Sequence, residues 1–450
     1  MYDQALRKIE EGTAVVSVIG LGYVGLPLAV GLAKSGYSVV GIDASPDKIE
    51  AIKQGSSYIP DIASTEVETL VRAGTLSSTT DYDVLHEVDV IFICVPTPFD
   101  TMKSPDLRYV RQAATGIASR LRPGQLVVLQ STTYPGTTEE VVKPILENNA
   151  SLLAGQDFYL AFSPERIDPG RQDFTVENTP KVVGGIDQQS ADLAAKLLAH
   201  LTPAIHVVSS PRAAEMTKLL ENIFRSVNIA LVNELAILAE RMEIDLWEVI
   251  EAAKTKPFGF MPFYPSPGVG GHCIPVDPYY LSWKAREYDF YTRFIELAAE
   301  VNGDMPYHTV NIVGQGLNRY GKSLNEANVL ILGVAFKPNI DDARNSAAQR
   351  VIELLIKKGA QVTYHDPYVP TYDVGGDVVL RETISFASVN LTPDVLAEVD
   401  CTVILTGHSN VDYDWIVSHS PLVVDTVNAT RHVSSDRNKI IRLGAANPIL

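Results

Sequence analysis

Residues 14–43 read AVVSVIGLGYVGLPLAVGLAKSGYSVVGID and carry the clearest indication of the fold class. An apolar run leads into the motif GLGYVG at 20–25, and helical spacing follows over Leu26–Ser35. A second apolar run, Ser38–Ile42, then ends at Asp43. Glycines in such a motif allow a tight turn and let a pyrophosphate approach the start of a helix. The stretch therefore predicts a β-α-β unit of the dinucleotide-binding type.

The carboxylate that ends this unit indicates which dinucleotide binds. Asp43 lies 18 residues after Gly25. At that place it can accept both ribose hydroxyls of NAD and would repel the 2′-phosphate of NADP. We therefore expect NAD as the cofactor; the alternative is a glycine-rich turn without a ligand. The residues expected to contact NAD are Gly20, Gly22, Tyr23, Val24, Gly25, Asp43, Pro96, Thr97 and Thr132.

Further apolar runs continue the alternation begun at residue 14. Short buried strands separated by helical segments are typical of a parallel sheet with crossover helices. Besides Ala14–Ile19 and Ser38–Ile42, the expected strands before residue 210 are Val90–Val95, Leu126–Gln130, Tyr159–Phe162, Lys181–Val183 and Ile205–Val208.

The pattern changes at Pro211. The segment Pro211–Met242 contains no glycine and no further proline, and its apolar residues recur at helical spacing. We expect one long, largely buried helix that links two domains and packs against a partner subunit, giving at least a homodimer. The residues that define its spacing are Met216, Leu219, Leu220, Ile223, Val227, Leu231, Leu235 and Leu238.

The rest of the chain completes the predicted α/β fold. Lys256–Pro278 is dense in proline, glycine and aromatic residues and indicates a long ordered loop, after which helical spacing covers Tyr279–Glu300. We expect two Rossmann-like, doubly wound domains joined by the long helix and a helical middle region. The domains are placed at 1–209, 210–305 and 306–450. The strands expected in the last domain are Asn328–Leu332, Gln361–Tyr364, Thr402–Leu405 and Leu422–Val424.

Composition excludes several classes of protein. The 450 residues carry a formal net charge of −17, which argues against a nucleic-acid partner. No run of 18 apolar residues occurs, and the first residues, MYDQALRKIEEG, lack an apolar signal core, so we expect no membrane association. Three cysteines argue against a disulfide scaffold. We expect a soluble, cytoplasmic protein.

Three short motifs follow predicted strands, at the sheet edge where doubly wound folds bind ligands. They are VPTP at 95–98, QSTT at 130–133 and SPER at 163–166. Hydroxyls such as that of Thr132 can orient a water or a substrate group, and Glu165 can act as a general base when it is partly desolvated. A plain loop start, helix capping and a solvated carboxylate are the respective alternatives.

Two polar residues interrupt the long apolar helix. Lys218 and Asn222 are four residues apart and share one face. A buried lysine costs free energy unless it is paired or functional, and here it can stabilise a developing oxyanion while Asn222 orders a water. The alternative is a lysine whose amine reaches solvent at the rim of the helix.

The loop PGVGGHCIPVDP at 267–278 carries the most specific chemistry. Cys273 follows three glycines close to a predicted helix start, where backbone amides lower a thiol pKa and make the thiol nucleophilic. Asp277 is placed to face it across one helical turn. A metal site is the rival, but adjacent His272 and Cys273 lack zinc spacing, so we expect no metal. A thiol beside a dinucleotide fold indicates oxidation of an aldehyde to an acid through a thiohemiacetal and a thioester.

These motifs together resemble the UDP-glucose/GDP-mannose dehydrogenase family, from Val15 to Asp425. The resemblance is carried by GLGYVGLPLA at 20–29, VPTP, QSTTYPGT at 130–137, SPER, the helix with Lys218 and Asn222, and GGHCIPVDPYYL at 270–281. Residues 257–288 are most similar to bacterial UDP-N-acetylglucosamine 6-dehydrogenases, which make N-acetylated hexuronic acids for surface polysaccharides. The resemblance implies two successive NAD-dependent oxidations at C6 of a UDP-sugar.

The resemblance also implies a role for each site residue. Cys273 would be the nucleophile of the second oxidation, and Lys218 would stabilise the oxyanion. Thr132, Asn222 and Asp277 would hold the water, and Glu165 would be the base for thioester hydrolysis. GVAFK at 333–337 matches a nucleotide-side motif of the C-terminal, UDP-sugar-binding domain. The residues expected to bind substrate are Glu165, Arg166, Lys218, Asn222, Tyr264, Gly268, Gly270, Gly271 and Lys337.

Three departures from glucose-specific members favour an N-acetylated sugar or leave contacts open. Pro169 replaces a second Glu, and Pro257-Phe258-Gly259 replaces a motif with an Arg that reaches the sugar. Asp425-Thr426-Val427-Asn428 lacks the Arg of a late family pattern, and Arg431 is a candidate substitute. We expect UDP-N-acetylglucosamine, with UDP-N-acetylgalactosamine, UDP-N-acetylmannosamine and UDP-glucose as rivals. From other classes, a two-electron hydroxyacid-type dehydrogenase and a non-catalytic NAD-binding protein remain alternatives.

Overall fold

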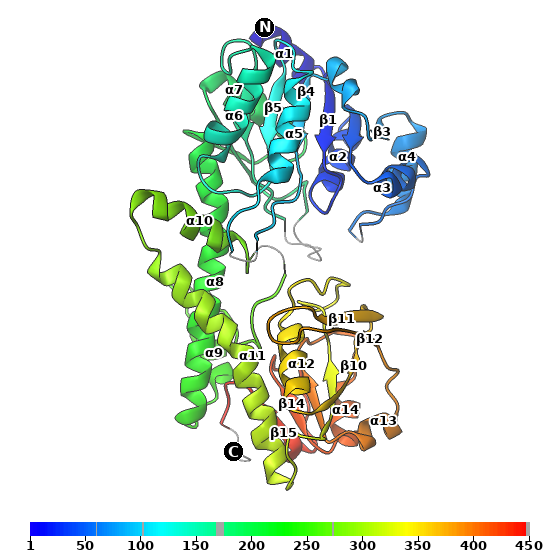
Figure 1. Cartoon of the computed structure of the whole chain (residues 1–450), viewed down its shortest axis with the longest axis vertical. Coiled ribbons are helices and arrows are strands. Elements are labelled where there is room, and N and C mark those ends of the chain that lie inside the picture. The colour runs from blue at the N-terminus through cyan, green and yellow to red at the C-terminus, as the bar shows by residue number, and fades with distance from the viewer. Residues whose placement is uncertain (60, 101–102, 168–174, 272–273, 447–450) are drawn as a thin grey trace. The chain divides into compact units, whose positions relative to one another are not determined.

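The computed structural model describes residues 1–59, 61–100, 103–167, 175–271 and 274–446. They form two compact units (Figure 1). Unit 1 comprises Met1–Glu221 and Tyr279–Phe290, and unit 2 comprises Asn222–Pro278 and Tyr291–Leu450. Each unit has its own sheet and its own hydrophobic core.

Unit 1 is built on an eight-stranded sheet of order β3-β2-β1-β4-β5-β6-β7-β8, parallel except between β6 and β7. The part β3-β2-β1-β4-β5-β6 is the order of a doubly wound dinucleotide-binding fold. The predicted parallel sheet is confirmed. β3 escaped prediction because its sequence, LSST, has a single apolar residue. The strands are β1 (Val15–Ile19), β2 (Ser38–Ile42), β3 (Leu76–Thr79), β4 (Val90–Ile93), β5 (Leu126–Leu129), β6 (Tyr159–Phe162), β7 (Lys181–Gly185) and β8 (Ile205–Val208).

Helices cover this sheet with apolar side chains. α2 (Gly25–Lys34) packs against β1 and β2 and is apolar on nearly every side, so Leu26, Leu28 and Leu32 are all buried. Burial of this kind contributes about 1.5–3 kcal/mol for each large aliphatic side chain. The other helices are α1 (Tyr2–Glu10), α3 (Pro46–Lys53), α4 (Ser64–Arg72), α5 (Arg108–Ala118), α6 (Lys143–Ala150) and α7 (Gln188–Leu198).

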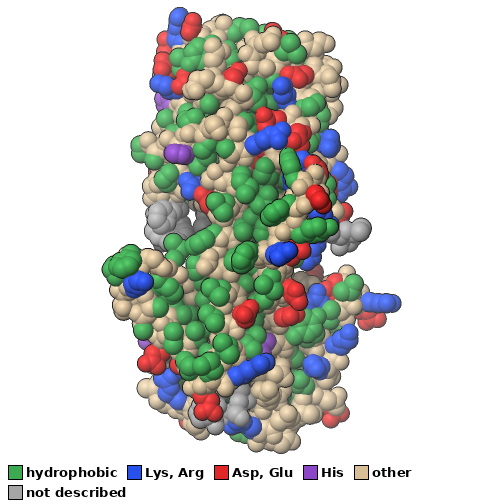
Figure 2. Space-filling view, turned by 90° about the vertical axis from the view of Figure 1, so that its left-hand side faces the viewer, with side chains coloured by type: hydrophobic (Ala, Val, Ile, Leu, Met, Phe, Trp, Pro, Cys, Tyr) green, Lys and Arg blue, Asp and Glu red, His purple; other side chains and the backbone are tan. Residues whose placement is uncertain are grey.

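The long helix α8 (Pro211–Arg241) forms where predicted, but it is not largely buried. Leu220, Leu231 and Leu238 are 58%, 54% and 48% exposed, and Met216 and Leu235 are exposed as well. The predicted burial is therefore wrong for the single chain, because the apolar spacing marks a face that this chain leaves uncovered. Figure 2 shows hydrophobic side chains gathered on this side of the molecule. The buried face instead includes five polar residues, Glu215, Lys218, Asn222, Ser226 and Asn233.

Among the described residues, α8 is the one helix that could cross a membrane by length and composition. The 18-residue window that meets this criterion has a mean hydropathy of 1.2 and is 33% buried. A single helix of this kind is weak evidence, since core helices of soluble proteins also meet the criterion. The polar face of α8 is hydrogen-bonded inside the units, for example from Asn233 Nδ2 to Asn302 Oδ1 at 2.9 Å.

Unit 2 contains a five-stranded parallel sheet of order β10-β9-β13-β14-β15 and a separate β11-β12 hairpin. Its four predicted strands are confirmed within one or two residues at each end, while β11, β12 and β15 were not predicted. The strands are β9 (Asn328–Leu332), β10 (Gln361–His365), β11 (Thr371–Gly375), β12 (Thr383–Ala387), β13 (Cys401–Ile404), β14 (Val423–Asp425) and β15 (Ile440–Arg442). The helices are α9 (Leu246–Lys254), α11 (Arg293–Arg319), α12 (Ala347–Lys357), α13 (Pro393–Glu398) and α14 (Tyr413–His419).

The helical pattern expected over Tyr279–Glu300 is interrupted. α10 (Asp277–Ala285) is followed by a short turn in which Asp289 takes a left-handed conformation with φ +52°. α11 then begins at Arg293 and continues well past the predicted end. Helical spacing alone did not reveal this break.

The two sheets share one local device after their central strands. Gly20 follows β1 with φ +93°, and a Cβ there would lie 2.6 Å from the carbonyl oxygen of Cys94. Gly333 follows β9 with φ +82°, and a Cβ there would lie 2.6 Å from the carbonyl oxygen of Thr406. Both positions require glycine for conformation and for close approach of the backbone.

Candidate active site

The glycine turn of unit 1 has the shape that a dinucleotide needs. A Cβ on Gly25 would lie 1.8 Å from the carbonyl oxygen of Gly20, so this glycine allows the helix to start directly against the turn. A Cβ on Gly22 would meet no atom within 4 Å, so the side of the turn that faces outward is open. Open space beside the first amides of α2 is where a pyrophosphate binds in folds of this type. The residues present therefore fit NAD.

Asp43 joins this turn to the end of β2. Its Oδ2 accepts from the Leu21 amide at 2.8 Å and from Lys48 Nζ at 3.1 Å, and its Oδ1 accepts from the Ser45 amide at 2.9 Å. The carboxylate is thus held still at the edge of the turn, with lone pairs left for ribose hydroxyls. Lys48 was not predicted.

The loops after β4 and β5 are tied together beside this turn. The Ser131 hydroxyl donates to the Val95 carbonyl at 2.7 Å, and the Tyr280 hydroxyl donates to the Thr97 carbonyl. Thr97 is buried and Thr132 is half-buried, so both lie at the floor of the sheet edge, whereas Pro96 is exposed. These contacts place two of the three predicted motifs side by side.

Glu165, after β6, is held by four donors. Gln130 Nε2 and Lys181 Nζ both donate to its Oε2 at 3.0 Å, and the amides of Arg166 and Ile167 donate to its Oε1 at 2.8 and 3.2 Å. Burial alone raises the pKa of Glu165, but Lys181 and the two amides outweigh burial and hold the pKa below its usual range. Glu165 is therefore ionised in the folded protein. Sequence reasoning missed Lys181 and Gln130.

The predicted substrate residue Arg166 already has protein partners. Its guanidinium donates to the Pro180 carbonyl at 2.8 Å and lies 2.6 Å from Glu221 Oε1. Any contact between Arg166 and a substrate would have to share these groups. The structure therefore brings Arg166 to the sheet edge as a structural link between β7 and α8.

Lys218 on α8 is 8% exposed. Within the part of the chain that the structure describes, its ammonium has no hydrogen bond and no ion pair. A cation that is shielded from water and lacks an anion favours a negatively charged or polarised ligand. This is the property that an oxyanion-stabilising lysine needs.

Glu215, one helical turn before Lys218, was not predicted. It is fully buried, and its carboxylate accepts from the Gly136 amide at 2.6 Å, the Thr138 amide at 2.9 Å and the Thr138 hydroxyl at 2.7 Å. Burial raises the pKa of Glu215 to about 7, against the opposing effect of these hydrogen bonds. Glu215 thus fastens the loop after β5, which contains Thr132, to the helix that carries Lys218.

In unit 2, Asn222 and Asp277 form a buried pair. Asn222 Nδ2 donates to Asp277 Oδ2 at 2.6 Å, and the two residues are 5% and 2% exposed. The predicted nucleophile Cys273 lies outside the described residues, as does His272. The two other cysteines are buried free thiols whose pKa values are raised by burial, as expected for Cys94 and Cys401 in strand cores.

Unit 2 also holds a cavity of about 530 Å³ at the carboxyl ends of β9, β13 and β14. Gly268 and Gly270 line one side of it, and Lys337, Arg431 and His408 line others. A Cβ on Gly270 would lie 2.8 Å from the Phe336 side chain, so glycine lets the loop pack closely there. Two cationic side chains on a concave wall favour an anionic ligand such as a diphosphate.

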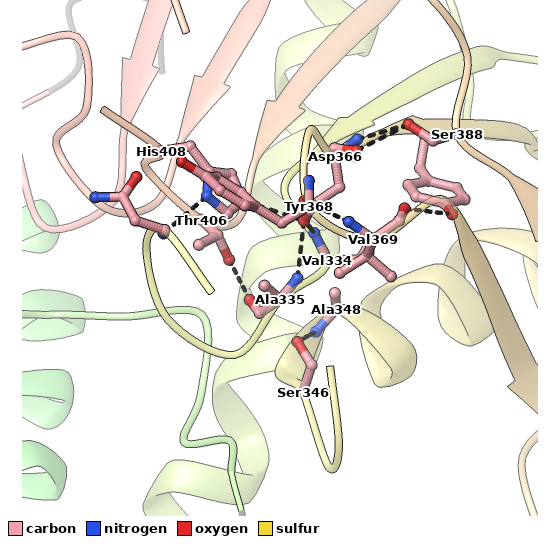
Figure 3. Close-up of polar contacts among 12 residues, drawn as sticks. Val334, Ala335, Ser346, Ala348, Asp366, Tyr368, Val369, Ser388, Thr406 and His408 are labelled. Atoms are coloured by element: carbon pink, nitrogen blue, oxygen red, sulfur yellow. Dashed lines mark hydrogen bonds and ion pairs between the residues drawn. The ribbon is translucent and has the colours of Figure 1, made fainter. Parts of the chain in front are cut away.

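Figure 3 shows how Asp366 organises the wall of this cavity. Its carboxylate accepts from the amides of Val334 and Ala335 at 2.7 and 3.0 Å, as Asp43 does from the amide of Leu21. The Asn339 amide donates to His408 Nδ1 at 3.0 Å, which leaves the ring hydrogen on Nε2, 3.1 Å from Asp366 Oδ2.

With further bonds from the Tyr368 and Val369 amides, five donors face this one carboxylate. Asp366 has no capacity left for ribose hydroxyls. A signal for it was present, since it lies two residues after the predicted strand Gln361–Tyr364, but its saturation by donors is visible only in the structure.

The remaining predicted substrate residues divide between this cavity and other places. Lys337 lines the cavity, and Gly271 packs beside it with φ +89° and accepts from Asn345 Nδ2 at 3.1 Å. Tyr264 is not among the lining residues that the structure describes. Its hydroxyl donates to Glu251 Oε1 at 2.7 Å, and its ring stacks on Trp247 with centroids 5.8 Å apart.

Comparison with known proteins identifies these features. Three consecutive models of the UDP-glucose/GDP-mannose dehydrogenase family match the chain: the NAD binding domain at 14–202, the central domain at 212–304 and the UDP binding domain at 330–432. The chain belongs to this family. The cavity of unit 2 lies largely within the residues matched by the UDP binding domain.

Individual relatives agree on the chemistry and differ in the sugar. The chain is 38% identical over 359 residues to UDP-N-acetyl-D-glucosamine 6-dehydrogenase of Pseudomonas aeruginosa, covering 80% of this chain and 84% of the relative. It is 38% identical over 356 residues to UDP-N-acetyl-D-mannosamine dehydrogenase of Pyrococcus horikoshii, covering 79% and 84%. The structure of UDP-D-ManNAc dehydrogenase from Pyrococcus horikoshii matches with a TM-score of 0.86 and 32% identity, over 96% of this chain and all of the other. The protein is an NAD-dependent UDP-sugar dehydrogenase.

Proposed function

We propose that this enzyme oxidises the C6 hydroxyl of a UDP-N-acetylhexosamine to the uronic acid, with UDP-N-acetylglucosamine as the preferred substrate and surface polysaccharide precursors as the product class. The observation that carries the choice of an N-acetylated sugar is Pro257-Phe258-Gly259, where glucose-specific members have an arginine. Three of four relatives at 38% identity are named for N-acetylated hexosamines, which supports the same choice.

The proposed mechanism assigns one task to each residue. When bound, NAD supplies the hydride acceptor for both oxidations. The first oxidation converts the C6 alcohol to an aldehyde, and its hydroxyl proton leaves through a water held by Thr132, Asn222 and Asp277. The Cys273 thiolate then adds to C6, forming a C–S bond and an oxyanion that the Lys218 ammonium stabilises.

The second oxidation and a hydrolysis complete the reaction. Loss of the second hydride from C6 converts the thiohemiacetal to a thioester. Water adds to this carbonyl, Glu165 accepts the proton of the water, and the C–S bond breaks to release the carboxylate and restore the thiol. One sugar therefore consumes one water and yields two NADH and three protons.

The choice of sugar is tested by comparing kcat/KM for UDP-N-acetylglucosamine, UDP-N-acetylgalactosamine, UDP-N-acetylmannosamine and UDP-glucose. The proposal expects the highest value for UDP-N-acetylglucosamine. A higher value for an epimer would replace the substrate within the class, and a higher value for UDP-glucose would overturn the reasoning from Pro257-Phe258-Gly259. A two-electron hydroxyacid-type dehydrogenase is the alternative from another class, and it predicts no dependence on Cys273.

We also propose that a second copy of this chain covers the exposed apolar face of α8, so that the enzyme is at least a homodimer. Leu231 and Leu238 are about half exposed on a face whose opposite side is buried and polar. Light scattering should give at least twice the chain mass of 49.0 kDa. Leu231→Asp combined with Leu235→Asp should give monomers, whereas Val378→Asp, at a site that is 91% exposed, should not. A stable wild-type monomer would contradict this proposal.

We place the enzyme in the cytoplasm, as a proposal of its own. Both described cysteines are buried free thiols, and the proposed chemistry requires a reduced Cys273. Activity recovered in the membrane or extracellular fraction instead of the soluble cell fraction would contradict this location.

A further inference from the structure

One buried cation near the sheet edge has no role in the mechanism above. Lys181 opens β7, the strand that runs antiparallel to β6, and it is 2% exposed. Its Nζ lies 3.0 Å from Glu165 Oε2. Among the residues that the structure describes, Glu165 is the one side chain that pairs with this ammonium.

A buried ion pair is a poor device for stability alone. Removing two charges from water costs free energy that their attraction does not always recover, and apolar side chains of similar size often stabilise a fold as well. The charged form of Lys181 therefore needs another explanation. Its position supplies one, since its neighbour Glu165 follows the carboxyl end of β6, where this fold binds its ligands.

We propose that Lys181 is a positioning residue of the oxidation: it holds Glu165 ionised and in one orientation, ready to accept the proton of the water that hydrolyses the thioester. The inference rests on the proposed function, because it assigns Glu165 the task of the base. Gln130 and the Arg166 and Ile167 amides complete the cradle, so both carboxylate oxygens are fixed. The Gln130 Oε1 atom is buried and has no hydrogen-bond partner among the described residues.

Among the described neighbours of Glu165, no other charged side chain replaces Lys181 in holding it ionised. The Cys94 thiol faces the pair from the end of β4, and its pKa is raised, so it stays neutral. Arg166 turns its guanidinium to Glu221 on α8, 2.6 Å away. Lys218, also on α8, forms no ion pair with a described residue. Without Lys181, the opposition to burial would be weaker and the pKa of Glu165 would rise, so a larger fraction of the base would be protonated and inactive at a given pH.

The test is a double-mutant cycle with Lys181→Met and Glu165→Gln. Lys181→Met should lower kcat at neutral pH by about 100-fold, the typical contribution of a general base, and the acidic limb of the kcat–pH profile should move to higher pH. Lys181→Arg is the matched control and should keep the wild-type profile. In the Glu165→Gln background, adding Lys181→Met should change kcat by about twofold or less, because a residue that acts through another has no separate effect.

The opposite results overturn the proposal. If the two single effects multiply in the double variant, or if Lys181→Met lowers kcat without moving the profile, Lys181 does not act through Glu165. Thermal unfolding and NAD binding of each variant separate these effects from misfolding, and the neutral double variant removes the unpaired charge that threatens folding.

A second readout keeps this inference separate from the proposed function. Infrared difference spectra between wild type and Glu165→Gln assign the protonated carboxyl band of Glu165. In Lys181→Met this band should persist to a higher pH than in the wild type, whether or not any UDP-sugar is turned over. If the band is lost at the same pH in both proteins, the role of Lys181 is overturned. If the band persists to higher pH in Lys181→Met but the wild type hydrolyses no thioester, the proposed function alone is overturned.

Discussion

Glu215→Gln isolates the free-energy cost of the buried carboxylate on α8. The pKa of Glu215 is raised from 4.5 to about 7 by burial. The folded state therefore binds this proton more tightly than the unfolded state. The carboxyl contributes its full stabilisation below about pH 4.5, and that contribution is lost as the pH rises to about 7. At about 1.4 kcal/mol for each tenfold change in proton affinity, about 2.5 kcal/mol of the free energy of unfolding is lost between pH 5 and pH 8.

The glutamine side chain of this variant does not titrate, so the variant lacks this loss. Urea unfolding of wild type and Glu215→Gln at pH 5 and pH 8 gives the difference in free energy of unfolding at each pH. The free energy of unfolding of the variant, relative to that of the wild type, should be about 2.5 kcal/mol higher at pH 8 than at pH 5. A fixed penalty arises because the glutamine amide is a poorer partner for Gly136 and Thr138, but it is the same at both pH values and cancels. An equal difference at pH 5 and pH 8 would refute the reasoning.

Three further predictions concern ligands and rate. Asp43→Asn should weaken NAD binding by about 10-fold or more, since a hydrogen bond to a charged group is worth about 1.5–3 kcal/mol. It should also reduce the ratio of NAD affinity to NADP affinity. An unchanged NAD affinity in calorimetric titration would contradict this prediction. Lys218→Met should lower kcat by about 100- to 1,000-fold with unchanged NAD affinity, and Lys218→Arg, which keeps the charge, is the control. Equal kcat in the wild type and both variants would exclude oxyanion stabilisation by Lys218. Lys337→Ala should weaken the binding of UDP alone by about 10-fold, measured by inhibition, and should leave the KM for NAD unchanged; unaltered inhibition would remove Lys337 from the nucleotide site.

The parts of the fold that sequence reasoning found are those with strong local signals. β1, β2 and the turn between them are identifiable because Gly20 and Gly25 sit where no other residue fits the backbone. β3 was missed because LSST has one apolar residue, and β11 and β12 were missed because their apolar residues alternate with exposed ones and form no continuous apolar run. The burial of α8 was wrong because spacing reports an apolar face and does not say what covers it.

The motifs of the site could be predicted from the sequence, but the contacts between its residues could not. Thr132, Glu165 and Asp277 could be named because each stands in a motif at a strand or helix end, and Lys218 because it interrupts a long apolar helix. The partners that set the behaviour of such groups are far away in the chain: Lys181 follows Glu165 by 16 residues, and Glu215 follows its contact Gly136 by 79 residues. Periodicity and spacing describe neighbours along one element, so pairs of this kind become visible only when the elements are packed.

The most direct test of the four-electron reaction is to count NADH formed per UDP-N-acetylglucosamine consumed, with NAD in excess and sugar limiting. Two NADH per sugar, falling to one or none in Cys273→Ser with no uronic acid formed, is the predicted result. One NADH per sugar in the wild type, or full acid formation by Cys273→Ser, would contradict oxidation through a thioester on Cys273.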